Sequence, residues 1–216
     1  MPKPPKPSLQ PRKSPLQARS TASVEAILEA TIQVLLDVGK ERLTTTRVAH
    51  RAGVSVGTLY QYFPNKSALL QAVLKRHLED VVAAIESASI SQRGQSLSQM
   101  ATGLIAAFLV AKFKSVHVSE ALYSVSDDVD GKQIVRQTGS RSIKAVAAML
   151  QTAKEPLATD PHLAASTLLS AIFGISRRML ESSLSKKQLE AVKHELIVLA
   201  TAYLNACAQP SRYSPQ

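Results

Sequence analysis

One short segment of the chain concentrates the side chains that could do chemistry. Residues 43–66 are LTTTRVAHRAGVSVGTLYQYFPNK. Within this segment, Thr58 and Gln61 carry hydrogen-bond donors and acceptors of the kind that read base edges, and the Tyr60 hydroxyl can bind a phosphate oxygen. Lys66 adds a positive charge at the start of a following helix, whose N-terminus also favours a phosphate. These side chains predict the recognition of a nucleic acid.

Two short helices joined by a tight turn are predicted to position these side chains. Thr44 can cap a helix over residues 45–52, because a threonine hydroxyl accepts a hydrogen bond from a free N–H in the first turn. Gly53 then permits a sharp turn, and Ser55 can cap the second helix. This arrangement is a helix-turn-helix, whose second helix can enter a major groove about 12 Å wide.

The second helix has two faces of different character. The spacing of a buried stripe is found at Leu59, Tyr62 and Phe63. The opposite face consists of Val56, Gly57, Thr58 and Gln61. Gly57 removes bulk where the helix would approach a duplex. Two alternatives stay open: Tyr60 as a core aromatic residue of a helical bundle, and Arg47, His50 and Arg51 as a solvated face.

From Val24 onward the sequence resembles the DNA-binding domain of the TetR family of one-component regulators. The resemblance covers residues 24–70 and is carried by the first helix (ILEATIQVLLDVG), the turn AGVS at residues 52–55, and TLYQYFPNK at residues 58–66. Leu35 replaces the aromatic residue that is common near the end of the family's first helix, and Thr45 stands where an apolar residue is frequent. Neither departure removes a DNA contact.

This resemblance implies roles for individual residues. Thr44, Thr45 and Arg47 are expected to anchor the first short helix to the DNA backbone. Residues 56–61 are expected to form the recognition helix, and Tyr60 and Lys66 to clamp phosphates. Because one recognition helix reads too few base pairs for operator-grade affinity, we expect a homodimer on a palindromic DNA operator. Repression is the commoner outcome in the family, so the resemblance implies a repressor.

Helical periodicity extends along the rest of the chain. Apolar residues follow three-four spacing from Val24 to Gly39, and again after Asn65, an expected N-cap, to about residue 87. A break around Gly94 precedes further predicted helices over residues 97–113, 119–126, 132–152, 163–182 and 186–208. No strand pattern is found. The predicted fold is all-α, with an N-terminal three-helix helix-turn-helix domain joined to a C-terminal helical ligand-binding and dimerisation bundle.

Three regions are expected from composition and pattern. Residues 1–20 hold six prolines, five basic residues and no acid, and predict a disordered basic tail. Residues 21–68 are the expected DNA-binding domain, and residues 69–210 the expected effector-binding and dimerisation domain. The last two helices are expected to start after two caps, Asp160 before Pro161 and Ser185 three residues before Gln188.

The C-terminal region carries no motif that identifies a ligand. Two apolar strips predict a dimer interface, although a monomer could bury them internally: Leu168, Ala171, Ile172 and Ile175; Leu189, Val192, Leu196, Leu199, Ala200 and Tyr203. Candidate ligand-pocket residues are Met100, Phe108, Phe113, His117, Tyr123, Met149, Phe173 and Arg177. The abundance of Ala and Leu indicates an apolar or amphipathic small-molecule effector.

Composition bounds the remaining possibilities. The chain has 26 basic and 16 acidic side chains, a net charge of +10, which favours a polyanionic partner. The alternative of a non-specific basic helical DNA-binding or membrane-surface protein therefore stays open. Cys207 is the only cysteine, and no signal-peptide pattern opens the chain, so we expect a cytoplasmic protein without a membrane partner. Motifs for phosphate loops, metal ligands or nucleophilic serines are absent, and we expect neither enzyme activity, nor a cofactor, nor a metal site.

Overall fold

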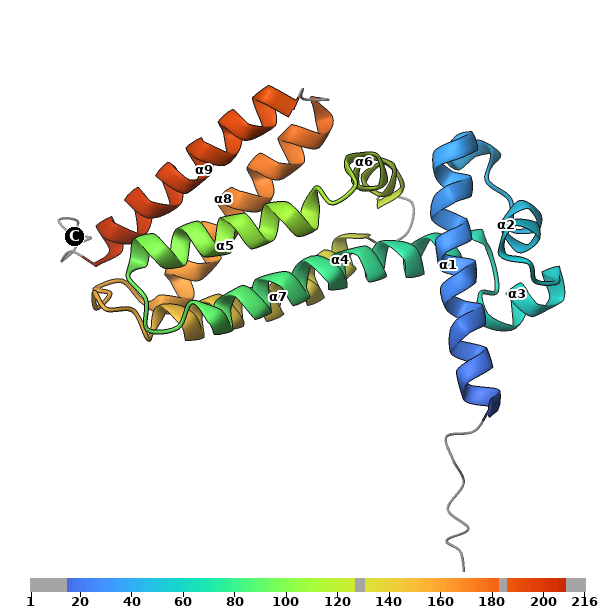
Figure 1. Ribbon diagram of the computed structural model, residues 1–216, viewed down its shortest axis with the longest axis horizontal. Helices are drawn as coiled ribbons and strands as arrows, with labels where there is room; N and C mark the ends of the chain where they lie inside the picture. Colours follow the sequence, from blue (N-terminus) through green and yellow to red (C-terminus); the bar gives the residue numbers. More distant parts are fainter. Residues whose placement is uncertain (1–14, 127–130, 183–185, 209–216) are drawn as a thin grey trace, which may run out of the picture. The chain divides into compact units, whose positions relative to one another are not determined.

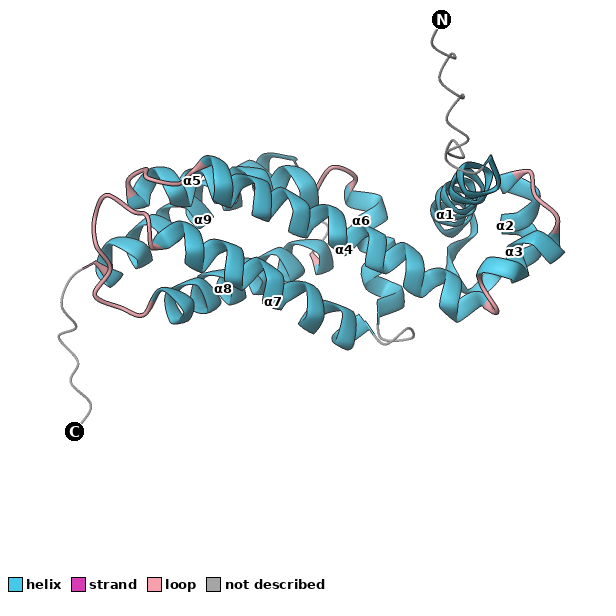
Figure 2. Cartoon of the chain, turned by 90° about the horizontal axis from the view of Figure 1, so that it is seen from below, coloured by secondary structure: helices cyan, strands magenta, loops and turns pink. Residues whose placement is uncertain are grey.

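The computed structural model describes residues 15–126, 131–182 and 186–208, and within these ranges the chain is helical and has no strand (Figures 1 and 2). The all-α prediction is confirmed. The chain divides into two compact units, with the division between Leu69 and Leu70. We describe them separately as the N-terminal unit and the C-terminal unit.

The N-terminal unit contains α1 (Pro15–Arg42), α2 (Thr45–Ala52), α3 (Val56–Tyr62) and the beginning of α4 (Lys66–Ser91). Its core contains buried apolar residues of all four helices, with α1 packed on α2 and α2 on α3. The fully buried side chains include Ile27, Leu43, Val48, Leu59 and Leu69. Burying each large aliphatic side chain stabilises the fold by about 1.5 to 3 kcal/mol.

The first helix departs from the prediction at both ends. Residues 15–20, predicted as disordered tail, are the first turns of α1, and residues 1–14 of that tail lie outside the described residues. A proline in the first turn, as at Pro15, loses no helical hydrogen bond, and the residues that follow it favour helix. At the other end Gly39 leaves the helical conformation, with φ +73°, and one more turn follows it to Arg42.

The short helices begin and end where the turn residues predict. The Thr44 hydroxyl accepts from the Arg47 N–H at 3.2 Å, and the Ser55 hydroxyl accepts from the Thr58 N–H at 2.9 Å. Gly53 ends α2 in the left-handed region, with φ +67°, which glycine adopts without a steric penalty. The Asn65 side chain accepts from the Ala68 N–H at 2.8 Å and caps α4, as predicted.

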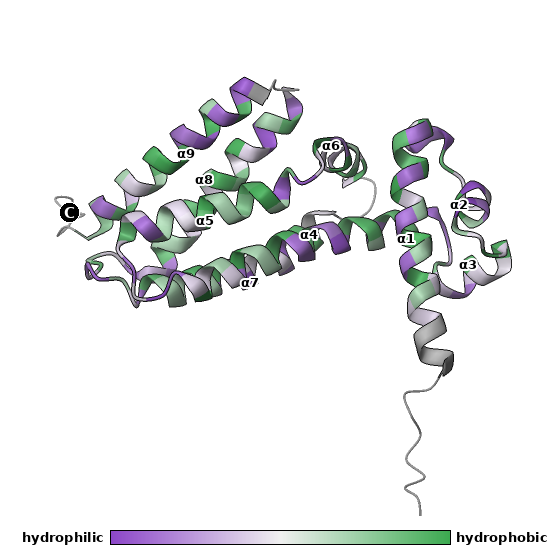
Figure 3. Cartoon of the chain, in the orientation of Figure 1, coloured by the Kyte–Doolittle hydropathy of each residue, from purple (hydrophilic) through white to green (hydrophobic). Residues whose placement is uncertain are grey.

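The C-terminal unit contains the rest of α4 and five further helices: α5 (Leu97–Lys112), α6 (Val116–Val125), α7 (Gly131–Leu150), α8 (Pro161–Glu181) and α9 (Lys186–Cys207). Helix α5 packs against α9, and α7 against α8. The second half of α5 is strongly apolar (Figure 3), and its Leu104, Ile105 and Phe108 lie at the centre of the core.

Helix starts in this unit follow local chemistry. Asp160 accepts from the Leu163 N–H at 2.8 Å with Pro161 in the first turn, which confirms the predicted start of α8. The capping box predicted at Ser185 lies outside the described residues. A capping box that sequence analysis overlooked starts α5: Ser96 accepts from the Gln99 N–H, and the Gln99 side chain accepts from the Ser96 N–H.

The two apolar strips predicted for a dimer interface are used largely within the chain. Leu168 and Ile172 of α8, and Leu196 and Ala200 of α9, are buried in the core of the C-terminal unit. The apolar side chains that these helices leave exposed are Leu163, Val198 and Leu199. Of the predicted strips, Leu199 is thus the large apolar side chain that stays open to a second copy.

Helix α8 is long and apolar enough to cross a membrane by composition alone, and α5 with α6 meets the same criterion only across a bend of 76°. Among the described residues no other helix does. The buried residues of α8 pack into the core of the C-terminal unit, as those of a core helix in a globular bundle do. Composition therefore gives no argument for membrane insertion.

The turn between α2 and α3 yields a test of local stability. A residue with a Cβ at position 53 would have to adopt the left-handed backbone conformation, which costs about 1 to 2 kcal/mol. Gly57 is helical, and a Cβ there would meet only ordinary contact with Ser55. We expect Gly53→Ala to lower the free energy of unfolding of the N-terminal unit by that amount, and Gly57→Ala not to lower it, as measured by amide hydrogen exchange of α2 and α3. Equal effects of the two substitutions would contradict this account of the turn.

Candidate functional site

The predicted recognition helix presents its expected face to solvent. Leu59 is buried beneath α3, whereas Val56, Gly57, Tyr60 and Gln61 are exposed, and Thr58 is half-buried. The Tyr60 side chain is 48% exposed, which excludes its reading as a core aromatic residue. The exposed face of α3 therefore combines a small residue, an amide and a phenol in a form that a major groove could accommodate.

A hydrogen bond joins the exposed parts of α2 and α3. The Thr45 and Tyr60 hydroxyl oxygens are 3.0 Å apart, and either can be the donor. Thr45 lies in the first turn of α2, where backbone N–H groups lack helical partners. The structure thus brings together three expected DNA-contacting residues: Thr44 and Thr45 at the start of α2, and Tyr60 on α3. The donors they offer are of the kind that bind phosphate oxygens.

The two expected cations of the site make contacts that the sequence did not predict. The Arg47 guanidinium donates to the carbonyl of Arg42 at 3.2 Å, and the Lys66 ammonium donates to the carbonyl of Lys40. Both carbonyls belong to the last turn of α1, after the break at Gly39. Arg47 and Lys66 therefore hold the end of α1 in addition to carrying positive charge near the start of α2 and α4.

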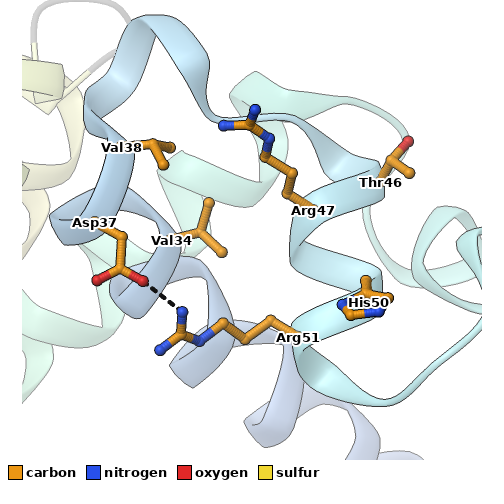
Figure 4. A pocket seen from close by; sticks show the side chains of 7 residues that line it. All are labelled: Val34, Asp37, Val38, Thr46, Arg47, His50 and Arg51. Atoms are coloured by element: carbon orange, nitrogen blue, oxygen red, sulfur yellow. Dashed lines mark hydrogen bonds and ion pairs between the residues drawn. The ribbon is translucent and has the colours of Figure 1, made fainter.

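A shallow groove lies between α1 and α2, lined by Val34 and Val38 of α1 and by polar residues of α2 (Figure 4). Arg51 crosses it, donating to the Gln33 side chain at 2.8 Å and pairing with Asp37. Arg51, for which a solvated face stayed open, is exposed and also links two helices. Because both partners are about half exposed, such a pair contributes no more than about 1 kcal/mol to stability.

The C-terminal unit contains a cavity of about 420 Å³ among α4, α5, α6, α7 and α8. This volume lies within the range of small-molecule sites. Four of the candidate pocket residues line it: Phe108, Tyr123, Phe173 and Arg177. The Phe108 and Phe173 rings lie 5.6 Å apart between centroids.

The other four candidates lie elsewhere. Met100 and Met149 are fully buried in the core, and Phe113 packs against it. The His117 side chain is 86% exposed and lies near Glu120. These four residues were chosen because they are large or polar-tipped and lie on predicted helices. Helical spacing does not distinguish a residue of the core from one of a cavity wall.

Among the polar residues of the cavity wall that the sequence did not single out, three lie together: His77 of α4, Lys112 of α5 and Ser119 of α6. The Ser119 hydroxyl donates to the Lys112 carbonyl at 2.6 Å and lies 3.3 Å from His77 Nε2. Burial, then the nearby Lys112 charge, lowers the pKa of His77 to about 4, against an opposing effect of Asp80. Burial also lowers the pKa of Lys112. A lone cation at the end of the apolar stretch LIAAFLVAK was the available signal.

A second polar cluster on the cavity wall is internally paired. Glu181 accepts from the Tyr123 hydroxyl and from Arg177 Nε, each at 3.0 Å. The Arg177 guanidinium also lies 5.1 Å from the centroid of the Tyr123 ring. The positive charge of Arg177 therefore already has a carboxylate partner.

Comparison with known proteins agrees with this division of the chain. Residues 27–73 match the model of bacterial regulatory proteins of the tetR family, and residues 96–204 match the model of the tetracycline repressor-like C-terminal domain. The chain belongs to the TetR family. Membership of a family of regulatory proteins agrees with the expectation that the chain is not an enzyme.

Individual relatives of this TetR-family protein match it in sequence over short stretches. The transcriptional repressor KstR of Mycolicibacterium smegmatis is 42% identical over 65 residues, 30% of this chain and 32% of the relative. The class C tetracycline repressor of Escherichia coli is 46% identical over 54 residues, 25% of each chain. The matches thus span only about a quarter to a third of these two relatives.

The likeness in fold extends further than the likeness in sequence. A putative TetR-family regulator from Mesorhizobium loti has a TM-score of 0.70 with this chain at 20% identity, covering 87% of this chain and 98% of the other. At this identity the comparison establishes the fold alone. The residues of the cavity therefore have to be interpreted from their own chemistry.

The lowered pKa of His77 predicts a pH dependence of stability. In the unfolded chain the pKa returns to about 6.5, so the unfolded state binds more protons between pH 6.5 and about 4. The stabilisation is complete above pH 6.5 and is lost as the pH falls through this window, by up to about 1.4 kcal/mol per pH unit for one proton. We expect His77→Gln to flatten this slope in urea denaturation, whereas His194→Gln, at an exposed position, should leave it unchanged. A slope unaltered by His77→Gln would refute the assignment.

Proposed function

We propose that the protein is a ligand-responsive transcriptional repressor, which binds a palindromic DNA operator as a homodimer in the cytoplasm. The observation that carries this proposal is the exposed face of α3, held by caps at both ends of the α2–α3 turn and joined to α2 by the Thr45–Tyr60 hydrogen bond. The relatives named as repressors favour repression over activation.

The face of α3 separates into base-reading and phosphate-binding groups. The Gln61 amide can donate and accept at a base edge, and Gly57 allows the helix to approach. Tyr60 and the start of α2 supply phosphate contacts, which set the orientation of the helix but carry no sequence information. The net charge of +10 adds an attraction that does not depend on sequence.

A dimer is supported by the exposed apolar residues of the last two helices. Leu163, Val198 and Leu199 are between 41% and 58% exposed although their helices form part of the core. Two copies joined through α8 and α9 would bury this surface and pair two recognition helices, as a palindrome requires.

Coupling between effector and operator is assigned to α4. This helix is continuous from Lys66 to Ser91. Its first turn packs into the N-terminal unit, while Leu74, His77, Val81 and Ile85 line the cavity of the C-terminal unit. An effector that binds better to one position of α4 would shift the population of DNA-binding conformers by the ratio of its two affinities.

Selection of bound fragments from random duplex DNA tests the proposed operator binding. We expect enrichment of a palindrome. On that site Tyr60→Phe, which removes one hydroxyl, should weaken binding of all sequences alike by about 1 kcal/mol, whereas Gln61→Ala should relax preference at one base pair of each half-site by about 1 to 3 kcal/mol. Recovery of no preferred sequence would favour the alternative of a non-specific DNA or membrane-surface binder.

A matched pair of valines tests the interface between copies. Val198 on α9 is 48% exposed and Val110 on α5 is 73% exposed. We expect Val198→Glu to dissociate the dimer, because it would bury a charge without a partner, and Val110→Glu to leave it intact. Analytical ultracentrifugation measures the outcome. A monomeric wild type, or dissociation by Val110→Glu instead, would count against an interface on α8 and α9.

A further inference from the structure

One cation on the wall of the cavity has no anionic partner in the described part of the chain. Lys112 lines the cavity from the last turn of α5. Its ammonium makes no ion pair or side-chain hydrogen bond within residues 15–126, 131–182 and 186–208. A desolvated charge of this kind is costly unless it acquires a partner. The cavity therefore favours a ligand that supplies a negative charge.

Neutral hydrogen-bonding groups lie beside this cation. Ser119 has one hydroxyl proton, which it donates to the Lys112 carbonyl, so the contact with His77 requires Nε2–H of His77 to donate to the Ser119 oxygen. The low pKa of His77 keeps the ring neutral at pH 7. Lys112 is therefore the one unpaired positive charge among these three residues, and His77 and Ser119 add polarity without charge.

The rest of the cavity wall is mainly apolar. Along α4 the lining residues Leu74, Leu78, Val81, Val82 and Ile85 cover a length of about 16 Å at the helical rise of 1.5 Å per residue. Leu122, Phe108 and Phe173 contribute from the other side. A ligand that fills the cavity must therefore carry an apolar body as well as a charged head.

We propose that the cavity binds an amphipathic monocarboxylate, with its carboxylate on the Lys112 ammonium and its apolar body along α4. The assignment rests on the proposed function in taking this cavity as the effector site. A single negative charge matches the single unpaired cation, because Arg177 is already neutralised by Glu181. A phosphate monoester, with a charge of about −1.5 to −2 at pH 7, would leave an excess negative charge in a desolvated site.

Calorimetric titration of the 216-residue chain with decanoate and decanol tests the proposal. The two probes have the same chain length and differ in the charge of the head. We expect decanoate to bind at least about tenfold more tightly than decanol, since a hydrogen bond to a charged group contributes roughly 1.5 to 3 kcal/mol. Equal affinities, or tighter binding of decanol, would overturn the proposal, and this comparison needs no variant protein.

A pair of lysine variants assigns the effect to one residue. Lys112→Met keeps the length and apolar stem of the side chain and should weaken decanoate binding by about tenfold to a hundredfold while leaving decanol binding unchanged. Lys114→Met, at an exposed position outside the cavity, should bind both probes as the wild type does. Far-UV circular dichroism verifies that both variants are helical. Unchanged decanoate affinity in folded Lys112→Met would overturn the assignment.

Titration of the selected operator complex with decanoate separates this inference from the proposed function. Binding that depends on Lys112 without a change in operator affinity would support the carboxylate site and overturn the ligand-responsive part of the proposed function. If the protein binds its operator but does not distinguish decanoate from decanol, the operator-binding part of the proposed function is supported and the carboxylate site is overturned. The two proposals therefore fail under different observations.

Discussion

The end of α1 is the constraint on which the N-terminal unit depends. Gly39 leaves the helical conformation, and the last turn of α1 ends at the loop that leads to α2. Two side chains from other helices supply donors to carbonyls of this turn: Arg47 to Arg42, and Lys66 to Lys40. The Lys40 carbonyl lies in a half-buried contact and would be costly without a partner, whereas the Arg42 contact is exposed. Together these contacts fix where α2 and α4 begin relative to α1. The position of α3, and with it the exposed recognition face, follows from that arrangement.

In the C-terminal unit, by contrast, one charged group is left without a partner among the described residues. Its core of leucine, isoleucine, methionine and phenylalanine side chains is densely buried, yet beside it the structure maintains a cavity with a desolvated lysine. Such a cavity sacrifices packing energy that a filled core would gain. Unfavourable local arrangements of this kind are found at functional sites, where a ligand supplies what the chain lacks. The Arg177 charge is paired with Glu181 and serves the fold. The Lys112 charge has no such partner among the described residues and is available to a ligand.

Local chemistry explains which features were predictable from sequence. Thr44, Gly53, Ser55 and Asp160 act within one helical turn of their own position, and the structure confirms each of them. Contacts between residues far apart in sequence were not predicted. The contacts of Arg51 were not predicted because its partners lie on α1, and Met149 was placed in the pocket because core and cavity residues share one periodicity. The same reason accounts for the dimer strips, whose central residues the chain buries within itself.

The continuity of α4 also limits how related chains can vary. Insertion of one residue between Leu74 and His77 would rotate His77 and every later position by about 100° around the helix axis relative to Leu74. His77 and Val81 would then leave the face on which Leu74 lines the cavity. Substitutions can therefore accumulate along this helix during evolution, but changes in its length cannot. The turn at residues 92–95 is constrained in length as well, because the Gly94 N–H donates to the Thr152 hydroxyl and the Gln95 carbonyl accepts from the Lys154 N–H.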